Sequence, residues 1–215
     1  MRAGIKILIG LFLLAAIMTS AGCTSSTADD LYSLPQASKE YLQLQNQIDA
    51  VLDETDAEYS PPTAGPNRQP VQLKDIDGDG ENEAIVFFRM TGDRPLKIYI
   101  MKQLDGIYET VSTIDGVGTA IESIRYADMD SDGISELVVG WQSAGLTHMA
   151  IYSVRDNQPA LLAESDYSKL ITSDLNDDGT TDVISLRLPT TEVPGAADMF
   201  MLRSDGEVVK KSAAL

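Results

Sequence analysis

The sequence predicts a mostly β protein, in which three repeats of about four antiparallel strands follow an N-terminal signal segment and a single α-helix. Three observations support this fold class. An apolar segment opens the chain, one later stretch has helical periodicity, and short runs rich in Val, Ile, Tyr and Phe alternate with Gly-, Asp-, Asn- and Pro-rich turns from Val71 onward. The 215 residues suit one domain with a short additional segment, and 43% hydrophobic residues are enough for a core.

The charge and the scarce cysteine and histidine exclude several kinds of site. The formal net charge is −17, so a phosphate backbone would be repelled and we expect no nucleic-acid partner. An acidic excess is compatible with cation binding. The chain has one cysteine and one histidine, which excludes an internal disulfide and a metal site built on a histidine pair.

Residues 1–22 predict a lipoprotein signal peptide. Arg2 and Lys6 accompany an apolar run over residues 7–18, which is too short to span a bilayer comfortably. Small residues then lead to Cys23, as in the lipobox of bacterial lipoproteins, although Ser20 stands where that motif usually has Leu. We expect Cys23 to carry a lipid that anchors the chain, outside the cytoplasm, to the bacterial cell membrane. The alternative is an ordinary cleaved signal with a stray cysteine.

Three further segments are expected before the β region. Residues 23–32 predict a flexible polar tether. Residues 33–58 predict a helix, because Ser33 and Gln36 can form a capping box and apolar residues recur at helical spacing. These apolar residues are Tyr41, Leu44, Ile48, Val51 and Leu52. Residues 59–70 contain four prolines and predict a linker.

Residues 71–215 predict the β domain. Its clearest strand-like runs are 84–89, 96–101, 108–114, 137–142, 148–154, 182–188 and 199–203. One pattern recurs three times, as DIDGDGENEAIVFF from Asp75, DMDSDGISELVVGW from Asp128 and DLNDDGTTDVISLR from Asp174, with spacings of 53 and 46 residues. Such periods are typical of propellers or stacked arrays, and four strands per period match one propeller blade. We therefore expect a partial, three-blade β-propeller.

The repeated pattern predicts three calcium-binding loops. Calcium takes six to eight oxygen ligands, and alternate residues of a curled loop can turn oxygens inward at positions one, three and five. Glycine at position six permits the sharp turn, the backbone carbonyl at position seven points inward, and a carboxylate at position nine closes the site. The predicted ligands are Asp75, Asp77, Asp79, Glu81 and Glu83; Asp128, Asp130, Asp132, Ile134 and Glu136; and Asp174, Asn176, Asp178, Thr180 and Asp182.

The loops have two other interpretations, an EF-hand and an ordinary turn. An EF-hand needs a bidentate Glu at position twelve, where this chain has Val86, Val139 and Ser185. Asp-Gly sequences also form ordinary turns, but three copies share phase, glycine and closing carboxylate. The third loop has Asn176 in place of Asp and is the weakest candidate for a metal site.

The pattern Asp-x-Asp/Asn-x-Asp-Gly-x-x-Asp/Glu, followed by an apolar strand, resembles the FG-GAP and VCBS-type repeats of integrin-α-like β-propellers. The resemblance covers Val71 to the C-terminus and implies calcium roles for the fifteen ligand positions. Together with the lipobox, the chain resembles bacterial surface lipoproteins with such repeats. Family propellers have about seven blades. Three blades imply an open array, completion by another chain, or a fragment of a longer protein.

No catalytic set is evident in the sequence. His148 lies in a predicted strand and is interpreted as a structural or surface residue, and the obvious carboxylate pairs belong to the predicted calcium loops. The aromatic residues Tyr99, Tyr108, Tyr126, Trp141 and Tyr152 could line a ligand surface but are more typical of a core. We expect a non-enzymatic binding module for a protein or carbohydrate ligand. The alternatives are a structural assembly module and, less favoured, an enzyme with its site on blade loops.

Overall fold

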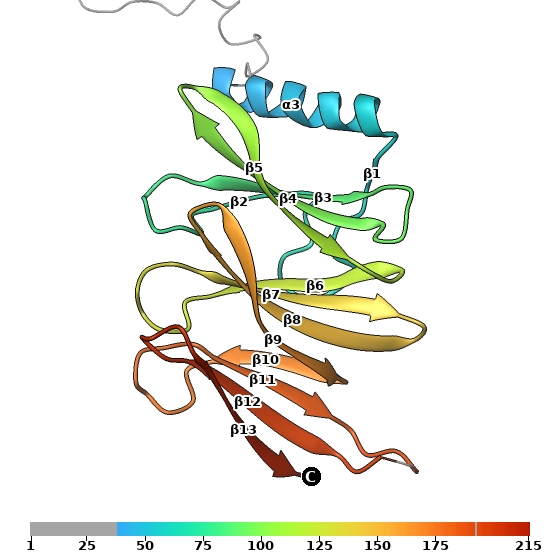
Figure 1. Ribbon diagram of the computed structural model, residues 1–215, viewed down its shortest axis with the longest axis vertical. Helices are drawn as coiled ribbons and strands as arrows, with labels where there is room; N and C mark the ends of the chain where they lie inside the picture. The colour runs from blue at the N-terminus through green and yellow to red at the C-terminus, as the bar shows by residue number, and fades with distance from the viewer. Residues whose placement is uncertain (1–37, 192) are drawn as a thin grey trace, which may run out of the picture. The chain divides into compact units, whose positions relative to one another are not determined.

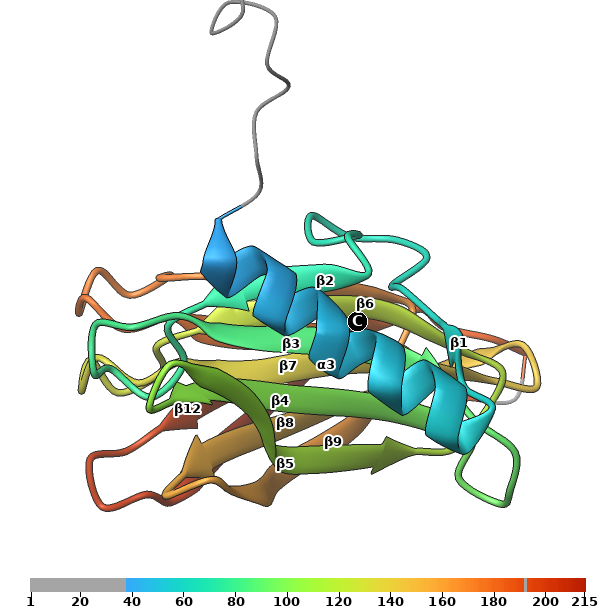
Figure 2. The same cartoon turned by 90° about the horizontal axis from the view of Figure 1, so that it is seen from above.

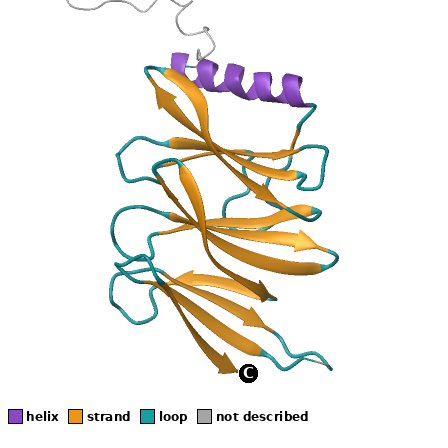
Figure 3. Ribbon diagram, viewed as in Figure 1, coloured by secondary structure: helices purple, strands orange, loops and turns teal. Residues whose placement is uncertain are grey.

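The computed structural model describes residues 38–191 and 193–215, which form one helix and three antiparallel β-sheets (Figure 1; Figure 3). The predicted mostly β class, with four-stranded antiparallel units after one helix, is confirmed. The three sheets do not close into a ring. The expected signal peptide, tether, Cys23 lipidation site and Ser33–Gln36 capping box lie outside the described residues.

The strands follow one another in chain order in two of the sheets, and in the third the first two strands both pair with the strand that comes next in the chain. Sheet A holds β1 (Glu58–Tyr59), β2 (Val71–Lys74), β3 (Glu83–Arg89), β4 (Leu96–Leu104) and β5 (Ile107–Gly116). Sheet B holds β6 (Ala120–Ala127), β7 (Glu136–Ser143), β8 (Leu146–Arg155) and β9 (Gln158–Tyr167). Sheet C holds β10 (Lys169–Ser173), β11 (Asp182–Arg187), β12 (Ala196–Leu202) and β13 (Val208–Ala214).

Strands β3 and β7 are apolar runs because both of their faces are covered. Alternate residues of β3 point to opposite sides: Ile85 and Phe87 join the cluster shared with sheet B, whereas Val86 and Phe88 face the helix. A second cluster fills the space between sheets B and C. The sheets are therefore stacked face to face and share continuous apolar layers.

Helix α3 (Lys39–Thr55) covers the outer face of sheet A (Figure 2). Leu44 and Ile48, one helical turn apart, are its buried residues and pack on Val86, Phe88 and neighbouring residues of the sheet. The helix ends at Thr55, before the predicted end at residue 58, because Glu58 and Tyr59 pair with Arg89 and Phe88 of β3. Among the described residues, no helix is long and apolar enough to cross a membrane.

The proline-rich segment 60–70 connects β1 and β2 of sheet A and is hydrogen-bonded to both sheet A and sheet B. The Ser60 amide donates to the Phe87 carbonyl of sheet A. The Thr63 and Ala64 amides donate to the Ile121 and Glu122 carbonyls of β6, at 3.0 and 2.7 Å. The side-chain amide of Asn67 also donates to β6, so the segment predicted as a linker lies along the free edge of that strand.

Candidate metal centre

The three acidic loops occupy equivalent places in the fold. Each loop connects the first and second full strands of its sheet, between β2 and β3, between β6 and β7, and between β10 and β11. We call them loops one, two and three. They lie on the same side of the sheet stack (left in Figures 1 and 2). Neighbouring loops touch: the Ser135 amide donates to the Ile76 carbonyl at 3.2 Å, and the Thr181 amide donates to the Asp128 carbonyl at 3.0 Å.

The same backbone hydrogen bonds shape all three loops. The first aspartate of each accepts from the amide of the position-six glycine, at 2.9 Å in loop one, 3.1 Å in loop two and 2.9 Å in loop three. These glycines have φ values of 87–89°, a left-handed conformation that favours glycine. The position-five aspartates accept from the amides of Glu81, Ile134 and Thr180. The sequence repeat is therefore also a structural repeat.

The position-nine carboxylates are buried at the start of β3, β7 and β11. Glu83 is 2% exposed, and Glu136 and Asp182 are fully buried. One oxygen of each accepts from a backbone amide at position two, on Ile76, Met129 and Leu175. The other oxygen has no hydrogen-bond donor: Glu83 Oε1, Glu136 Oε1 and Asp182 Oδ1. A buried, ionised oxygen without a donor is costly unless a cation faces it.

Burial perturbs the acid chemistry at these positions. It raises the pKa of Glu83, and it raises the pKa of Glu136 to about 7. In loop two, burial and the neighbouring Asp132 also raise the pKa of Asp130. Burial would likewise raise the pKa of Asp132, but the Ile134 amide and the Arg155 guanidinium lower it overall. These carboxyls stand where an added positive charge would relieve both burial and mutual repulsion.

Loops one and two gather three carboxylates each, and loop three is more open. Within the described residues, one oxygen each of Asp75, Asp77 and Glu83 lie within 4.8 Å of one another, as do those of Asp128, Asp130 and Asp132. In loop three the Asn176 side-chain amide donates to Asp178 Oδ2 at 2.7 Å. Hydrogen bonds from Thr180 and Asn176 lower the pKa of Asp178.

Two basic side chains enter the loops from strands that the sequence did not connect with them. Lys102 of β4 places Nζ 2.5 Å from Asp77 Oδ2, 2.6 Å from Asp79 Oδ2 and 3.7 Å from Glu83 Oε1. Arg155, the last residue of β8, lies 2.6 Å from Asp132 Oδ2, 3.6 Å from Asp130 Oδ2 and 4.0 Å from Glu136 Oε1. The equal spacing of each basic residue from its loop could have signalled this arrangement.

No known family model matches the sequence, and comparison with curated proteins finds no similar one. The function therefore has to be inferred from the residues themselves. The predicted ligand set fits a divalent cation by the chemistry of its donors: carboxylate oxygens at four positions in loops one and two and at three positions in loop three, one amide oxygen at Asn176, and one buried donor-free oxygen at each position nine. Hard cations such as calcium take such oxygen ligands. Inward orientation of the carbonyls of Glu81, Ile134 and Thr180 stays a prediction.

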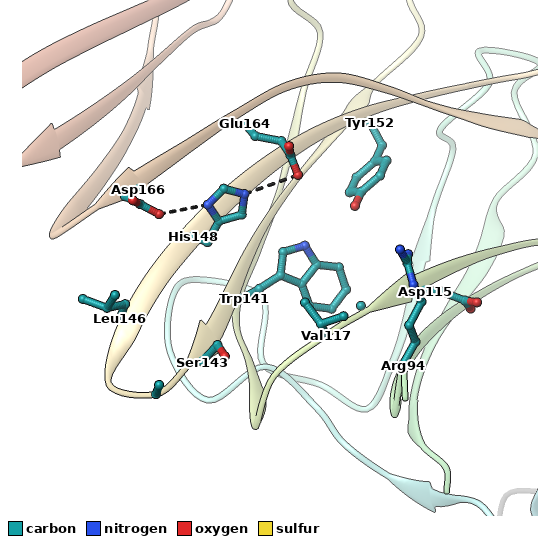
Figure 4. Close-up of a pocket in the computed structure, with 12 residues that line it drawn as sticks. Arg94, Asp115, Val117, Trp141, Ser143, Leu146, His148, Tyr152, Glu164 and Asp166 are labelled. Carbon is teal, nitrogen blue, oxygen red and sulfur yellow. Dashed lines mark hydrogen bonds and ion pairs between the residues drawn. The ribbon is translucent and has the colours of Figure 1, made fainter. Parts of the chain in front are cut away.

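A separate groove of about 440 Å³ lies beside Trp141 (Figure 4). Trp141 packs directly on Gly116, where an added Cβ would come within 2.2 Å of the indole ring. His148 Nδ1 lies 3.0 Å from Asp166 Oδ1, and Nε2 lies 3.3 Å from Glu164 Oε1. Burial lowers the pKa of His148, but the hydrogen bonds to Asp166 and Glu164 outweigh it and raise the pKa overall.

Most of the predicted aromatic residues contribute to the cores. Trp141 is buried in the cluster between sheets A and B, against which Tyr126 and Tyr152 also pack. Tyr99 and Tyr108 belong to the layer between sheet A and the helix. Trp141 and Tyr152 additionally line the groove, so these two side chains have both a packing role and an accessible edge.

Proposed function

We propose that this chain is a calcium-stabilised, non-enzymatic binding module held at the outer surface of a bacterial membrane through a lipid on Cys23. The observation that carries the calcium proposal is the buried, donor-free carboxylate oxygen at position nine of all three loops. In loop one an oxygen of Glu83 lies within 4.8 Å of oxygens of Asp75 and Asp77, and the same backbone hydrogen bond from the position-six glycine fixes the first aspartate of all three loops. When bound, the ion would neutralise these carboxylates and tie the start of the second full strand to the loop before it.

We further propose that the three sheets are blades of an FG-GAP/VCBS-like propeller. Each sheet has consecutive antiparallel strands, and each carries its acidic loop at the same point. In β3 the side chain of Glu83 lies on the same face as that of Ile85, and in β7 the side chain of Glu136 lies on the same face as that of Val138. Ile85 and Val138 face the next sheet along the chain. The sequence resemblance and this repeated geometry support the propeller together.

The calcium proposal is tested by thermal unfolding of the full chain in millimolar calcium, in matched magnesium and in chelator. Extracellular modules bind calcium at about 10⁻⁴–10⁻³ M, so with a dissociation constant near 0.1 mM, about 1 mM calcium adds roughly 1.4 kcal/mol per occupied site. We expect a calcium-selective rise of several degrees. Asp182→Asn should reduce the rise, and Asp205→Asn, in the exposed turn before β13, should not. Equal melting in the three buffers would refute calcium binding.

The groove beside Trp141 is the proposed recognition surface. It combines an aromatic residue with carboxylates, Arg94 and His148, a mixture suited to hydrogen-bonding ligands such as carbohydrates or polar peptides. Trp141 is the only tryptophan in the chain, so its fluorescence reports on the groove directly. Titration with oligosaccharide and peptide panels should produce a saturable change for one class. Arg94→Ala should weaken that change, and Arg203→Ala, outside the groove, should not.

A second candidate function is assembly with another β-sheet. Residues Ile184, Met199 and Met201 alternate with the residues of sheet C that face sheet B, and none of them belongs to the three apolar clusters. Ile184 is 9% exposed and Met199 and Met201 are half-buried, and within the described residues no helix or further sheet covers this apolar face of sheet C, whereas α3 covers the opposite end of the stack. Sedimentation at increasing concentration should show association that Met199→Lys abolishes. A monomer at all concentrations would argue against self-assembly.

A further inference from the structure

We propose that Lys102 and Arg155 are built-in cations that stabilise loops one and two without a metal and compete with a divalent ion there, whereas loop three has no such cation. The competition with a divalent ion rests on the proposed calcium function, whereas the stabilisation by Lys102 and Arg155 rests on the ion-pair geometry alone. It assigns a role to two residues outside the predicted ligand set.

The two basic residues occupy equivalent positions in the repeat. Lys102 follows Asp75 by 27 residues, and Arg155 follows Asp128 by the same interval (102 − 75 and 155 − 128). Both lie in the strand that follows the buried one: Lys102 lies close to the end of β4, and Arg155 is the last residue of β8. Each makes its contacts with loop positions three, five and nine. These are three of the positions expected to ligate calcium.

The basic residue of the third repeat points elsewhere. Arg203 directly follows β12, the corresponding strand of sheet C. Its guanidinium pairs with Asp205 at 3.5 Å and Glu207 at 3.3 Å in the adjoining hairpin. Among the described residues, no ion pair reaches the carboxylates of loop three. The buried Asp182 Oδ1 therefore has no hydrogen-bond donor, and no basic side chain of the described residues lies within 4.0 Å of it.

The residue at position three changes together with the cation. Loops one and two have Asp77 and Asp130 there, and their side chains contact the basic residue. Loop three has the neutral Asn176. In loops one and two, four ligand carboxylates and one basic side chain give a net charge of −3. In loop three, three ligand carboxylates without a basic side chain also give −3. Counted over the predicted side-chain ligands and the paired cation alone, the three sites thus have the same formal charge, and Glu81 and Asp177 add one further carboxylate each to loops one and three.

Space beside Lys102 makes its displacement feasible. A cavity of about 310 Å³ adjoins loop one and is lined by Glu40, Glu81, Glu83, Lys102 and Tyr108, among others. An ammonium group that leaves Asp77 and Asp79 can swing toward Glu40 or Glu81 and keep an acidic environment. A lysine side chain is positively charged at neutral pH, so Lys102 remains a cation in either position.

The experiment compares Lys102→Met and Arg155→Met with the matched controls Lys97→Met and Arg203→Met, all in the full chain. Lys97 lies on the same strand as Lys102 and pairs with Asp115 at 2.8 Å, away from the loops. Melting temperature in chelator and calcium affinity by titration calorimetry are measured for each protein. We expect the two loop variants to melt at least several degrees lower in chelator and to bind calcium about tenfold more tightly at the affected loop, because a competing unit charge is removed. The controls should resemble wild type.

Further variants cover the case in which a methionine variant does not fold. Lys102→Arg keeps the charge and should behave as wild type. Asn176→Asp lies in an exposed loop and adds a carboxylate with no matching cation, so it should lower the metal-free melting temperature and strengthen calcium binding. Unchanged metal-free melting and unchanged calcium affinity in the loop variants would overturn the inference. If no protein binds calcium while the loop variants still melt early, the calcium function and the competition fail, and the built-in cations stand.

Discussion

At the scale of single residues, Glu136 shows how a burial cost is built into the loops. Its carboxyl is fully buried, with one oxygen on the Met129 amide and the other facing Arg155 at 4.0 Å. That distance is long for an ion pair, so the guanidinium compensates only part of the desolvation. The pKa of about 7 is the thermodynamic expression of this imbalance.

Glu136→Gln should therefore stabilise the metal-free protein at high pH. An acid with a pKa raised above 4.5 keeps its proton longer in the folded state, so folding stability falls as pH rises from about 4.5 through about 7. We expect the variant to exceed wild type by about 1–3 kcal/mol at pH 8, with little difference near pH 4. Urea denaturation in chelator measures this, with Asp205→Asn as the exposed control. A variant less stable than wild type at pH 8 would contradict the burial cost.

His148 should contribute a stabilisation that, like the contribution of Glu136, falls as pH rises. Its pKa is raised by Asp166 and Glu164, so its ion pairs stabilise the fold fully below the unfolded pKa of about 6.5 and are lost as pH rises through the folded value. The imidazole is 39% exposed, so solvent screening limits the effect to about 0.5 kcal/mol. The melting temperature of wild type minus that of His148→Gln should fall between pH 5 and 8. High salt should abolish the trend, and a difference independent of pH would exclude the ion pairs as its source.

At the scale of elements, helix α3 acts as a cover for sheet A. Ile48 is 1% exposed and Leu44 is 5% exposed, and they seal the layer that contains Val86 and Phe88. Tyr41, which has the same helical periodicity, is 57% exposed. Fewer residues of the helix are thus buried than its apolar periodicity predicts, as expected for a helix that rests on a twisted sheet.

Ile48→Ala should loosen this cover. Truncating a fully buried isoleucine costs about 2–5 kcal/mol through lost transfer energy and the cavity left behind. We expect a lower urea midpoint and increased binding of a hydrophobic dye as Phe88 becomes accessible. Leu42→Ala, on the exposed side of the same helix, should change stability by less than about 0.5 kcal/mol. Equal effects of the two substitutions would mean that the helix does not pack on the sheet.

Strands that consist mainly of apolar residues with high β-propensity were predictable from the sequence, and the others were not. The seven predicted runs all coincide with observed strands, such as β3 and β7, whose apolar residues are buried on both faces, and only the runs 182–188 and 199–203 extend one residue beyond β11 and β12. Strand β9 contains Pro159, Ala160 and Leu161, and β13 contains two lysines and two alanines. Such sequences have weak β-propensity, and pairing with β8 and β12 decides their conformation.

The loops were predictable in phase but not in charge balance. Spacing alone aligned the aspartates, glycines and closing carboxylates, because these residues are adjacent in the chain. The contacts of Lys102 and Arg155 depend on how β4 and β8 pair with their neighbouring strands, and no local pattern encodes that pairing. For the same reason the sequence did not reveal that Ser135 of loop two donates to Ile76 of loop one.

At the scale of the whole molecule, shared layers should make sheets A, B and C unfold together. One apolar cluster joins sheets A and B, another joins B and C, and neighbouring loops are hydrogen-bonded. We expect far-UV circular dichroism and Trp141 fluorescence to give coincident urea transitions, since the tryptophan lies in sheet B and the dichroism reports on all three sheets. Gly116→Ala, which crowds the indole, should shift both curves equally. Separated transitions would show that the sheets unfold independently.

The proline-rich segment has a practical consequence for anyone producing this protein. A shorter chain that begins at Val71, the natural choice from composition, would lose the residues that hydrogen-bond to Ile121, Glu122 and Ile124. The edge of β6 would then expose the unpaired carbonyls of Ile121, Glu122 and Ile124, a template on which other chains can align. We expect such a product to precipitate or form fibrils. An expression boundary placed before Lys39 would retain both the segment and the helix.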